Sequence, residues 1–369
     1  MPDNKKINKK VVFFSNSESH FYNHLLPIAM KASSKGYQVS LITNPGDYKA
    51  KLDRYSIEVI PINLERGSIN PFQELMTLFN LFMILLRKKP DILHNFTVKP
   101  VLYGTIASIF LPGVKVVNTF LGMGYLFISH KLFYRFLRNI YCGLLSVIGF
   151  FRKIDYIVQN QDDKLLLLSK QIKNIRVQCS VGVDLRKYKK FPSPKGKVVF
   201  AMVSRMLKDK GVLEFIEAAK DLQDLNAEFW LVGEPDKQNK ASLSESFLKS
   251  QKTVKYLGHI EDINSIWKKS HVAVLPSYRE GLSRSLLEAG ACGRVIITTD
   301  APGGRDLVKD GEDGLLVPVA SSKELATAMR RMYEDKNLRE KLTLNMQKKI
   351  VQNYDAGYIA ELIVNSYEE

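Results

Sequence analysis

Two segments in the second half of the chain carry residue types that suit a diphosphate. The turn SRMLKDKG holds two cations, Arg205 and Lys210. The segment SYREGLSRSLLEAGACG is predicted to be a loop followed by a helix from about Ser283. The first-turn N–H groups of such a helix, at residues 282–285, attract anions. Two cations opposite that helix end would complete a diphosphate clamp.

Two carboxylates in the same segment suit a sugar. Glu280 lies on the predicted loop, and Glu288 lies two helical turns further along. A carboxylate that accepts hydrogen bonds from vicinal hydroxyls is a common way to bind a ribose. Each residue has an ordinary alternative, since Arg205 and Lys210 could be solvated turn residues and Glu288 could cap its helix or pair within it.

Alternating apolar runs and amphipathic stretches predict the elements that position these residues. Strands are predicted at residues 11–14, 38–43, 57–60, 91–94, 114–118, 156–159, 198–204, 229–232, 254–257, 272–276, 295–299 and 315–317. Helices are predicted at residues 21–34, 72–87, 101–109, 131–151, 213–222, 263–268, 283–291 and 322–333. This alternation is typical of the α/β class, with parallel sheets covered on both faces. Two such series predict two doubly wound, Rossmann-like domains with a ligand cleft between their strand ends.

The domain boundaries follow from a change in composition. Residues 187–197, KYKKFPSPKGK, combine charge with two prolines and a glycine, which is typical of a linker. We therefore expect one domain at residues 1–186 and a second at residues 198–353. A last helix within residues 354–369 has no strand after it, so we expect it to pack back across the domains.

Composition excludes several classes of protein. The chain has 369 residues, of which 45% are hydrophobic and 25% charged, a globular composition. The three scattered cysteines suit neither a disulfide framework nor a zinc site and favour a reducing compartment. The densest apolar run, residues 78–86, is far shorter than the roughly 20 residues of a membrane span. We expect a cytoplasmic protein.

The net charge of +16 belongs entirely to the first half of the chain. Up to Lys190 there are 28 Lys and Arg against 12 Asp and Glu, and from Phe191 onward there are 26 of each. This asymmetry indicates an anionic partner: nucleic acid, an anionic membrane or a phosphorylated ligand. A basic face that serves only solubility is the alternative. The chain shows no nucleic-acid reading module or aromatic stacking platform, so we expect no nucleic-acid partner.

The second half resembles the retaining glycosyltransferases of the GT-B fold, family 4. The resemblance rests on SRMLKDKG, YLGHIEDI, LPSYREGLSRSLLEAGACG, TTDAPGGRDLV and DGLLVP, which occur in that order. The first half resembles bacterial transferases that extend undecaprenyl-diphosphate-linked glycans, through FYNHLLPIAMKASSKGYQVSLIT, INPFQEL, PDILHNFTVKPVLYG and VVNTFLGMGYLF. The resemblance implies an acceptor-binding first domain and a second domain that binds a nucleotide-sugar donor.

The resemblance also implies roles for single residues. Arg205 and Lys210 would hold the donor diphosphate, Glu280 would contact the transferred sugar, and Glu288 would bind the ribose. The implied donor-binding set is Ser204, Arg205, Lys210, Gly258, His259, Glu280, Gly281, Leu282, Ser283 and Glu288, of which Arg205, Lys210 and Glu280 are the catalytic candidates. It implies that the loop at residues 15–19, after the first strand, approaches the donor phosphates, and Ser17 and Ser19 in this loop are acceptor-side candidates. His94, which would face the cleft from a strand end, and the adjacent Asn95 are further acceptor candidates, or His94 is satisfied by backbone.

Two absences bear on the expected mechanism. The chain contains no Asp-x-Asp signature for a divalent ion, so we expect no metal, with Lys210 and Arg205 stabilising the leaving group. Many relatives carry a histidine where this chain has Thr119-Phe120-Leu121-Gly122, so no histidine acts there. The resemblance implies front-face attack, in which the acceptor hydroxyl gives its proton to the departing phosphate.

A basic, apolar segment predicts contact with a membrane. Residues 130–153 contain no acid, and Lys131, Arg135 and Arg138 recur at helical spacing. Such a segment suits an interfacial helix on anionic lipid, or else its apolar face is core and its cations are solvated. A lipid-diphosphate acceptor favours the membrane interpretation and a peripheral location on the inner face of the cell membrane.

Together these observations predict a retaining glycosyltransferase that needs no metal. The resemblance implies a hexose or N-acetylhexosamine donor, UDP-linked as in UDP-GalNAc, UDP-GlcNAc or UDP-Gal. It also implies an undecaprenyl-diphosphate-linked saccharide acceptor, in the biosynthesis of surface polysaccharide or glycoprotein glycans. Alternatives are an epimerase or hydrolase on the same fold, which would need carboxylates or histidines converging on the sugar carbon, or a basic nucleic-acid-binding protein.

Overall fold

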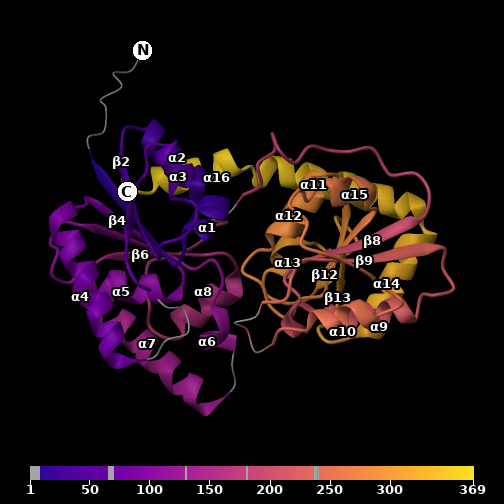
Figure 1. Ribbon diagram of the computed structural model, residues 1–369, viewed down its shortest axis with the longest axis horizontal. Helices are drawn as coiled ribbons and strands as arrows, with labels where there is room; N and C mark the ends of the chain where they lie inside the picture. Colours follow the sequence, from indigo (N-terminus) through magenta and orange to yellow (C-terminus); the bar gives the residue numbers. More distant parts are fainter. Residues whose placement is uncertain (1–8, 65–69, 129–130, 180–181, 237–238, 240) are drawn as a thin grey trace. The chain divides into compact units, whose positions relative to one another are not determined.

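The protein forms two compact units, which we describe separately. The computed structural model describes residues 9–64, 70–128, 131–179, 182–236, 239 and 241–369. The first unit comprises Met1–Val181 and Gly357–Glu369, and the second comprises Gly182–Ala356 (Figure 1).

The first unit is built on a seven-stranded parallel sheet in the order β3-β2-β1-β4-β5-β6-β7. The strands are β1 Lys10–Ser15, β2 Gln38–Thr43, β3 Glu58–Pro61, β4 Ile92–Phe96, β5 Lys115–Thr119, β6 Ile154–Val158 and β7 Ile175–Val177. Val11 of β1 lies opposite Val39 of β2 on one side and Ile92 of β4 on the other. The strand order therefore reverses between β1 and β4, where a doubly wound sheet places its ligands.

Helices cover both faces of this sheet (Figure 1). They are α1 Glu18–His20, a π-helical turn Phe21–Leu25, α2 Leu26–Ser34, α3 Lys49–Asp53, α4 Pro71–Lys88, α5 Val98–Ser108, α6 Gly124–Ile128, α7 Leu132–Phe151, α8 Gln161–Leu168 and the last helix of the chain, α16 Ala356–Asn365. Side chains alternate along β1, so Val11 and Phe13 pack in the core under α2 and α16 while Val12 and Phe14 pack under α4 and α5. The core residues of α7 pack on β5 and β6 beside α5.

The second unit repeats the plan with a six-stranded parallel sheet, β10-β9-β8-β11-β12-β13. Its strands are β8 Val198–Val203, β9 Ala227–Val232, β10 Lys255–Gly258, β11 Val272–Leu275, β12 Val295–Thr299 and β13 Leu315–Val317. Its helices are α9 Val212–Lys220, α10 Glu245–Ser250, α11 Asn264–Lys269, α12 Arg284–Ala291, α13 Gly304–Leu307, α14 Ser322–Glu334 and α15 Lys336–Asn353, with a 3-10 turn at Lys208–Lys210. Here the strand order reverses between β8 and β11.

The α/β class with two doubly wound parallel sheets is confirmed, but the units divide earlier than the expected linker. Residues 187–197 belong to the second unit. They are fastened there, because Phe191 N donates to Cys292 O at 3.1 Å and Arg294 donates to Pro192 O at 3.1 Å. The first and last segments of this unit lie side by side, since Val183 N donates to Tyr354 O at 2.8 Å.

The carboxyl-terminal helix α16 completes the core of the first unit. Its residues Ile359, Ala360, Ile363 and Val364 are buried there, together with Tyr367 just beyond its end. The Tyr367 hydroxyl lies 2.7 Å from His94 Nδ1, and both side chains are almost fully buried. This hydrogen bond attaches the end of the chain to the middle of the sheet.

The bond between Tyr367 and His94 predicts a measurable loss of stability. Tyr367→Phe leaves His94 Nδ1 buried without a partner, which we expect to lower the free energy of unfolding by about 1–3 kcal/mol. Tyr358→Phe is the matched control, because Tyr358 lies on the same helix and is 50% exposed. Urea unfolding of both variants measures the difference, and equal midpoints would contradict a structural role for the buried hydroxyl.

Candidate active site

The donor candidates lie where the strands of the second sheet end. Ser204 and Arg205 follow β8, residues 276–283 follow β11, and residues 300–303 follow β12. The strand order reverses between β8 and β11, and doubly wound sheets bind ligands at the strand ends beside such a reversal.

Backbone contacts hold these three loops together. Tyr278 N donates to Asp209 O at 2.9 Å, and Ser277 Oγ donates to the same carbonyl at 3.2 Å. Glu280 N donates to Pro302 O at 2.9 Å, which ties the loop after β11 to the loop after β12. The position of Glu280 is therefore set by main-chain contacts on both sides.

Lys210 and Glu280 form an ion pair in which Nζ lies 2.6 Å from Oε1. Only 14% of the Lys210 side chain and 16% of the Glu280 side chain are exposed. A pair this far from water interacts more strongly than an exposed pair, and each charge depends on the other for compensation. The structure thus brings together one predicted cation and one predicted carboxylate.

Arg205 has a different partner from Lys210. Its Nη1 lies 2.7 Å from the Asp236 carboxylate, and 57% of the Arg205 side chain is exposed. An ion pair with this much exposure contributes little to stability. The ion pair with Asp236 therefore fixes the Arg205 side chain only weakly, on the loop that follows β8.

Helix α12 begins after Ser283, one residue later than predicted. The Ser283 hydroxyl accepts from Leu286 N at 3.5 Å and so caps the helix. The helix runs to Ala291, and its N-terminus follows the loop that carries Glu280. The partial positive charge of this helix end therefore adds to that of Lys210 at the same edge of the sheet.

Glu288 is buried in α12 and paired within it. Arg284 Nε donates to Glu288 Oε1 at 2.9 Å, and the Tyr188 hydroxyl is a second partner. Burial raises the pKa of the Glu288 carboxyl, and the charge of Arg284 opposes this rise. The pairing within the helix that was named as the ordinary alternative is therefore present, and the Glu288 side chain is only 8% exposed.

The remaining donor candidates occupy the same edge of the sheet. Gly258 ends β10 with φ +66°, and its carbonyl accepts from Gly233 N at 2.8 Å. His259 follows it and is exposed. Ser204 N donates to Val232 O at 3.0 Å. Gly281 and Leu282 lie between Glu280 and the start of α12.

Among the acceptor candidates, Ser17 and Ser19 lie directly after β1, at the point where the first sheet reverses its strand order. Ser17 caps α1, because its hydroxyl accepts from His20 N at 3.3 Å, and Ser19 Oγ lies 3.4 Å from Ser17 Oγ. These two hydroxyls are at the carboxyl edge of the sheet.

The expectation that His94 and Asn95 face an acceptor is wrong. Strand β4 runs to Phe96, two residues beyond the predicted end, so both side chains lie inside the unit. His94 Nε2 lies 2.7 Å from Thr119 Oγ1, and burial lowers the pKa of His94 to about 3. Asn95 points to the opposite face, where its Nδ2 donates to Asn118 Oδ1 at 2.8 Å.

The prediction of a cationic face on α7 needs correction at Arg138. Its Nη1 donates to Phe127 O at 2.8 Å, so Arg138 contacts α6, the helix before α7, and is only partly exposed. Lys131 and Arg135 are exposed. Two of the three cations that were predicted to share a face are therefore exposed to solvent.

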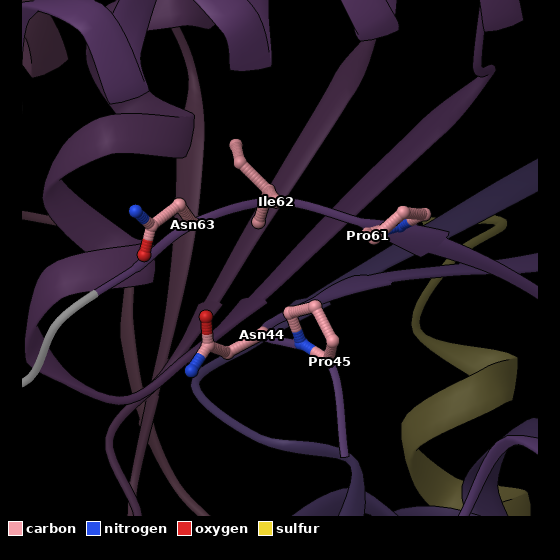
Figure 2. Close-up of a pocket in the computed structure, with 5 residues that line it drawn as sticks. All are labelled: Asn44, Pro45, Pro61, Ile62 and Asn63. Carbon is pink, nitrogen blue, oxygen red and sulfur yellow. The ribbon is translucent and has the colours of Figure 1, made fainter.

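An open pocket of about 360 Å³ lies at the carboxyl edge of the first sheet. Its lining residues are Asn44, Pro45, Pro61, Ile62 and Asn63. Figure 2 shows them on the two neighbouring segments where β2 and β3 end. Within the part of the chain that the structure describes, no three His, Cys, Asp or Glu side chains gather as metal ligands, and no helix is long and apolar enough to cross a membrane.

Three residues of this site were missed at the level of sequence. Arg284 stands four residues before Glu288, a helical pair spacing that could have identified it. Tyr188 fell within the expected linker, and Asp236 follows β9 in a loop with no recognisable motif. The arrangement as a whole offers two cations, a helix N-terminus and two carboxylates at one sheet edge, which suits a sugar joined to a diphosphate.

Family models match both halves of the chain. The model described as "Glycosyl transferase 4-like" matches residues 10–161, and the model "Glycosyl transferases group 1" matches residues 185–349. The first match covers β1 to β6 of the first sheet, and the second covers all six strands of the second sheet.

Known proteins similar to this chain are glycosyltransferases. An N,N'-diacetylbacillosaminyl-diphospho-undecaprenol α-1,3-N-acetylgalactosaminyltransferase of Campylobacter jejuni is 29% identical over 97% of this chain and 98% of its own. A UDP-Gal:α-D-GlcNAc-diphosphoundecaprenol α-1,3-galactosyltransferase of Escherichia coli is 28% identical over 78% of each chain. The crystal structure of HepE of Anabaena with UDP shares the fold, with a TM-score of 0.80, 19% identity and coverage of 97% of this chain and 99% of that one.

The close approach of two loops at Gly211 predicts the cost of adding a side chain there. Gly211 has φ +77°, and a Cβ would lie 2.1 Å from Pro276 O. We expect Gly211→Ala to lower the free energy of unfolding by ~2–4 kcal/mol, because it combines left-handed strain with a backbone clash. Gly311→Ala is the control, since Gly311 has φ +70° with nothing within 4 Å. Denaturant unfolding of both variants separates strain from clash, and equal losses would show that the loops do not meet at this point.

Proposed function

This chain belongs to the GT-B glycosyltransferases that combine a 4-like domain with a group 1 domain, and we propose that it transfers a hexose or N-acetylhexosamine from a UDP-sugar to an undecaprenyl-diphosphate-linked saccharide, with retention of configuration. The single observation that carries the proposal is the ion pair of Lys210 and Glu280 beside the N-terminus of α12. A cation and a carboxylate side by side at a helix N-terminus support binding of a diphosphate and of the sugar joined to it.

The diphosphate of the donor would take Lys210 and Arg205 from their internal partners. Both cations are paired with carboxylates in the free protein, Lys210 with Glu280 and Arg205 with Asp236. A diphosphate presents more negative charge than one carboxylate and accepts hydrogen bonds from several donors at once. The amides of the first turn of α12 would bind the same group.

The sugar and the nucleoside would lie on either side of the diphosphate. Glu280, released by Lys210, would accept hydrogen bonds from the transferred sugar. Glu288 would accept from the ribose hydroxyls, and Arg284 and Tyr188 hold its carboxylate in one orientation. Backbone at Gly258 and His259 would contact the base.

The proposed reaction is a front-face displacement. The bond from the anomeric carbon to the donor phosphate oxygen breaks, and the acceptor oxygen bonds to that carbon on the same face. The acceptor proton passes to the departing phosphate oxygen. Lys210 and Arg205 stabilise the charge that develops on that oxygen, which is the role a preorganised cation fills in a site sheltered from water. We propose that these two cations serve in place of a metal ion.

Relatives support the class of acceptor. The names of the proteins from C. jejuni and E. coli describe acceptors that are saccharides joined to diphosphoundecaprenol, and the name of the E. coli protein describes a UDP-linked donor. A lipid of this kind is reached at a membrane, so we propose a peripheral location on the inner face of the cell membrane. Ser17 and Ser19 remain the acceptor-side candidates.

A calorimetric titration tests the donor site. We expect UDP to bind in preference to GDP and CMP, with the same affinity in EDTA as in Mg²⁺. Lys210→Met removes a charge-assisted hydrogen bond and should weaken UDP binding about 10- to 100-fold. The control is Lys208→Met, because Lys208 lies in the same turn and is exposed. Loss of binding in EDTA would contradict the metal-free site, and a preference for GDP would contradict the UDP donor.

A turnover assay then separates transfer from hydrolysis. With a UDP-sugar and an undecaprenyl-diphosphate-linked saccharide we expect UDP release that depends on the acceptor and a product whose new linkage keeps the donor's α configuration by NMR. Free sugar formed at the same rate without acceptor would instead identify a hydrolase.

A further inference from the structure

Helix α7 has two apolar faces, and only one of them lies in the core. Tyr141, Cys142, Leu145 and Ile148 are buried against the sheet. The other face is exposed to solvent, and its large apolar side chains are 41–82% exposed. They are Leu132, Phe133, Phe136, Ile140, Leu144, Val147, Phe150 and Phe151. The outward face of a surface helix in a soluble protein normally carries polar residues. The exposed apolar face of α7 is therefore typical of a surface that contacts another apolar partner.

Helix α4 repeats the pattern. Its core side is formed by Thr77, Leu81 and Leu85. Its outer side carries Phe72, Leu75, Met76 and Phe79, which are 45–74% exposed, and Leu86 at 39%. The first four recur at the spacing of one helical face.

Contacts join the two helices through the end of α5. The ring of Phe82 on α4 packs edge-on against Phe110, with centroids 5.6 Å apart. At the other end, Arg152 beside Phe151 donates to the carbonyls of Ser108 and Val114. Ile109 and Phe110, 48% and 66% exposed, lie between these contacts. Figure 1 shows α4, α5 and α7 along the same side of the first sheet.

The surroundings of this surface are strongly basic. Residues 71–153 contain ten Lys and Arg but only Glu74 and Asp91 as acids. Glu74 is already paired with Lys99 at 2.8 Å. Exposed cations lie near the ends of both helices, at Arg87, Lys89, Lys131, Arg135 and Lys153. Apolar side chains beside cations fit the boundary between the acyl chains and the anionic headgroups of a bilayer.

We propose that the exposed apolar residues of α4 and α7, with Ile109 and Phe110, form one surface that inserts into an anionic lipid bilayer. The excess of positive charge favours this occupant over a second copy of the chain, because two such surfaces would repel each other. The inference deepens the proposed function, since it rests on the acceptor being a lipid and names the surface by which the enzyme reaches it.

Vesicle co-sedimentation with paired variants tests the surface. Ile140→Ser with Val147→Ser removes two side chains of α7 seven residues apart, 45% and 59% exposed. Phe72→Ser with Phe79→Ser does the same for α4, at 74% and 56%. Each pair should weaken binding to vesicles of phosphatidylcholine and phosphatidylglycerol at least about tenfold. The control is Leu344→Ser with Val351→Ser, on α15 of the second unit, with the same spacing and 54% and 45% exposure; it should bind like the unchanged protein.

Two further measurements on the same variants keep the failure of this proposal distinct from failure of the proposed function. Each variant should keep its UDP affinity and its turnover on an acceptor with a short, water-soluble lipid. Unchanged vesicle binding by the α7 and α4 pairs would overturn the membrane surface. The membrane surface would also be overturned if the unchanged protein were a dimer by light scattering and the paired variants of α7 and α4 were monomers. Vesicle binding without any UDP binding would instead overturn the proposed function and leave the surface standing.

Discussion

The parallel direction of all strands in each sheet is the constraint on which the rest of this structure depends. Every strand therefore ends at the same edge, so the loops after the neighbouring strands β8, β11 and β12 meet there. Gly211 and Gly303, both with positive φ, then let these loops approach Pro276 O and Glu280 O more closely than any side chain allows. The ion pair of Lys210 and Glu280 follows from this backbone arrangement, because main-chain contacts already fix both loops.

Much of this fold could be predicted because buried strands are short apolar runs. Residues 38–43 and 295–299 match β2 and β12 residue for residue. The three-residue strand β7 was missed because its residues are only partly buried or exposed and carry little pattern. Helix α15 was missed for a different reason, since Leu342, Met346 and Ile350 are its only fully apolar core contacts among eighteen mostly polar residues. The position of the donor candidates at one sheet edge could be predicted, because these residues follow directly from strand ends.

Side-chain partners distant in sequence could not be predicted from spacing. Lys210 and Glu280 are 70 residues apart, and His94 and Tyr367 are 273 apart. For His94, an error of two residues at the end of β4 changed a surface candidate into a buried one. For α7, periodicity indicates apolar faces but not which of them the fold covers. The exposure of Phe136 and Val147 depends on where the neighbouring helix α5 lies, which is a property of the tertiary structure.

The ion pairs of Lys210 and Arg205 with carboxylates bear on which ligand the proposed site would favour. Lys210 is mostly shielded from water, so leaving its ammonium without a counter-ion would cost free energy, and Glu280 prevents this in the free protein. In the proposed site, a diphosphate bound to Lys210 would remove one partner of the Glu280 carboxylate, and a sugar hydroxyl would donate to it instead. A nucleoside diphosphate without its sugar satisfies only half of this exchange. In the proposed site the ion pair of Lys210 and Glu280 would therefore favour the complete donor over the nucleotide product.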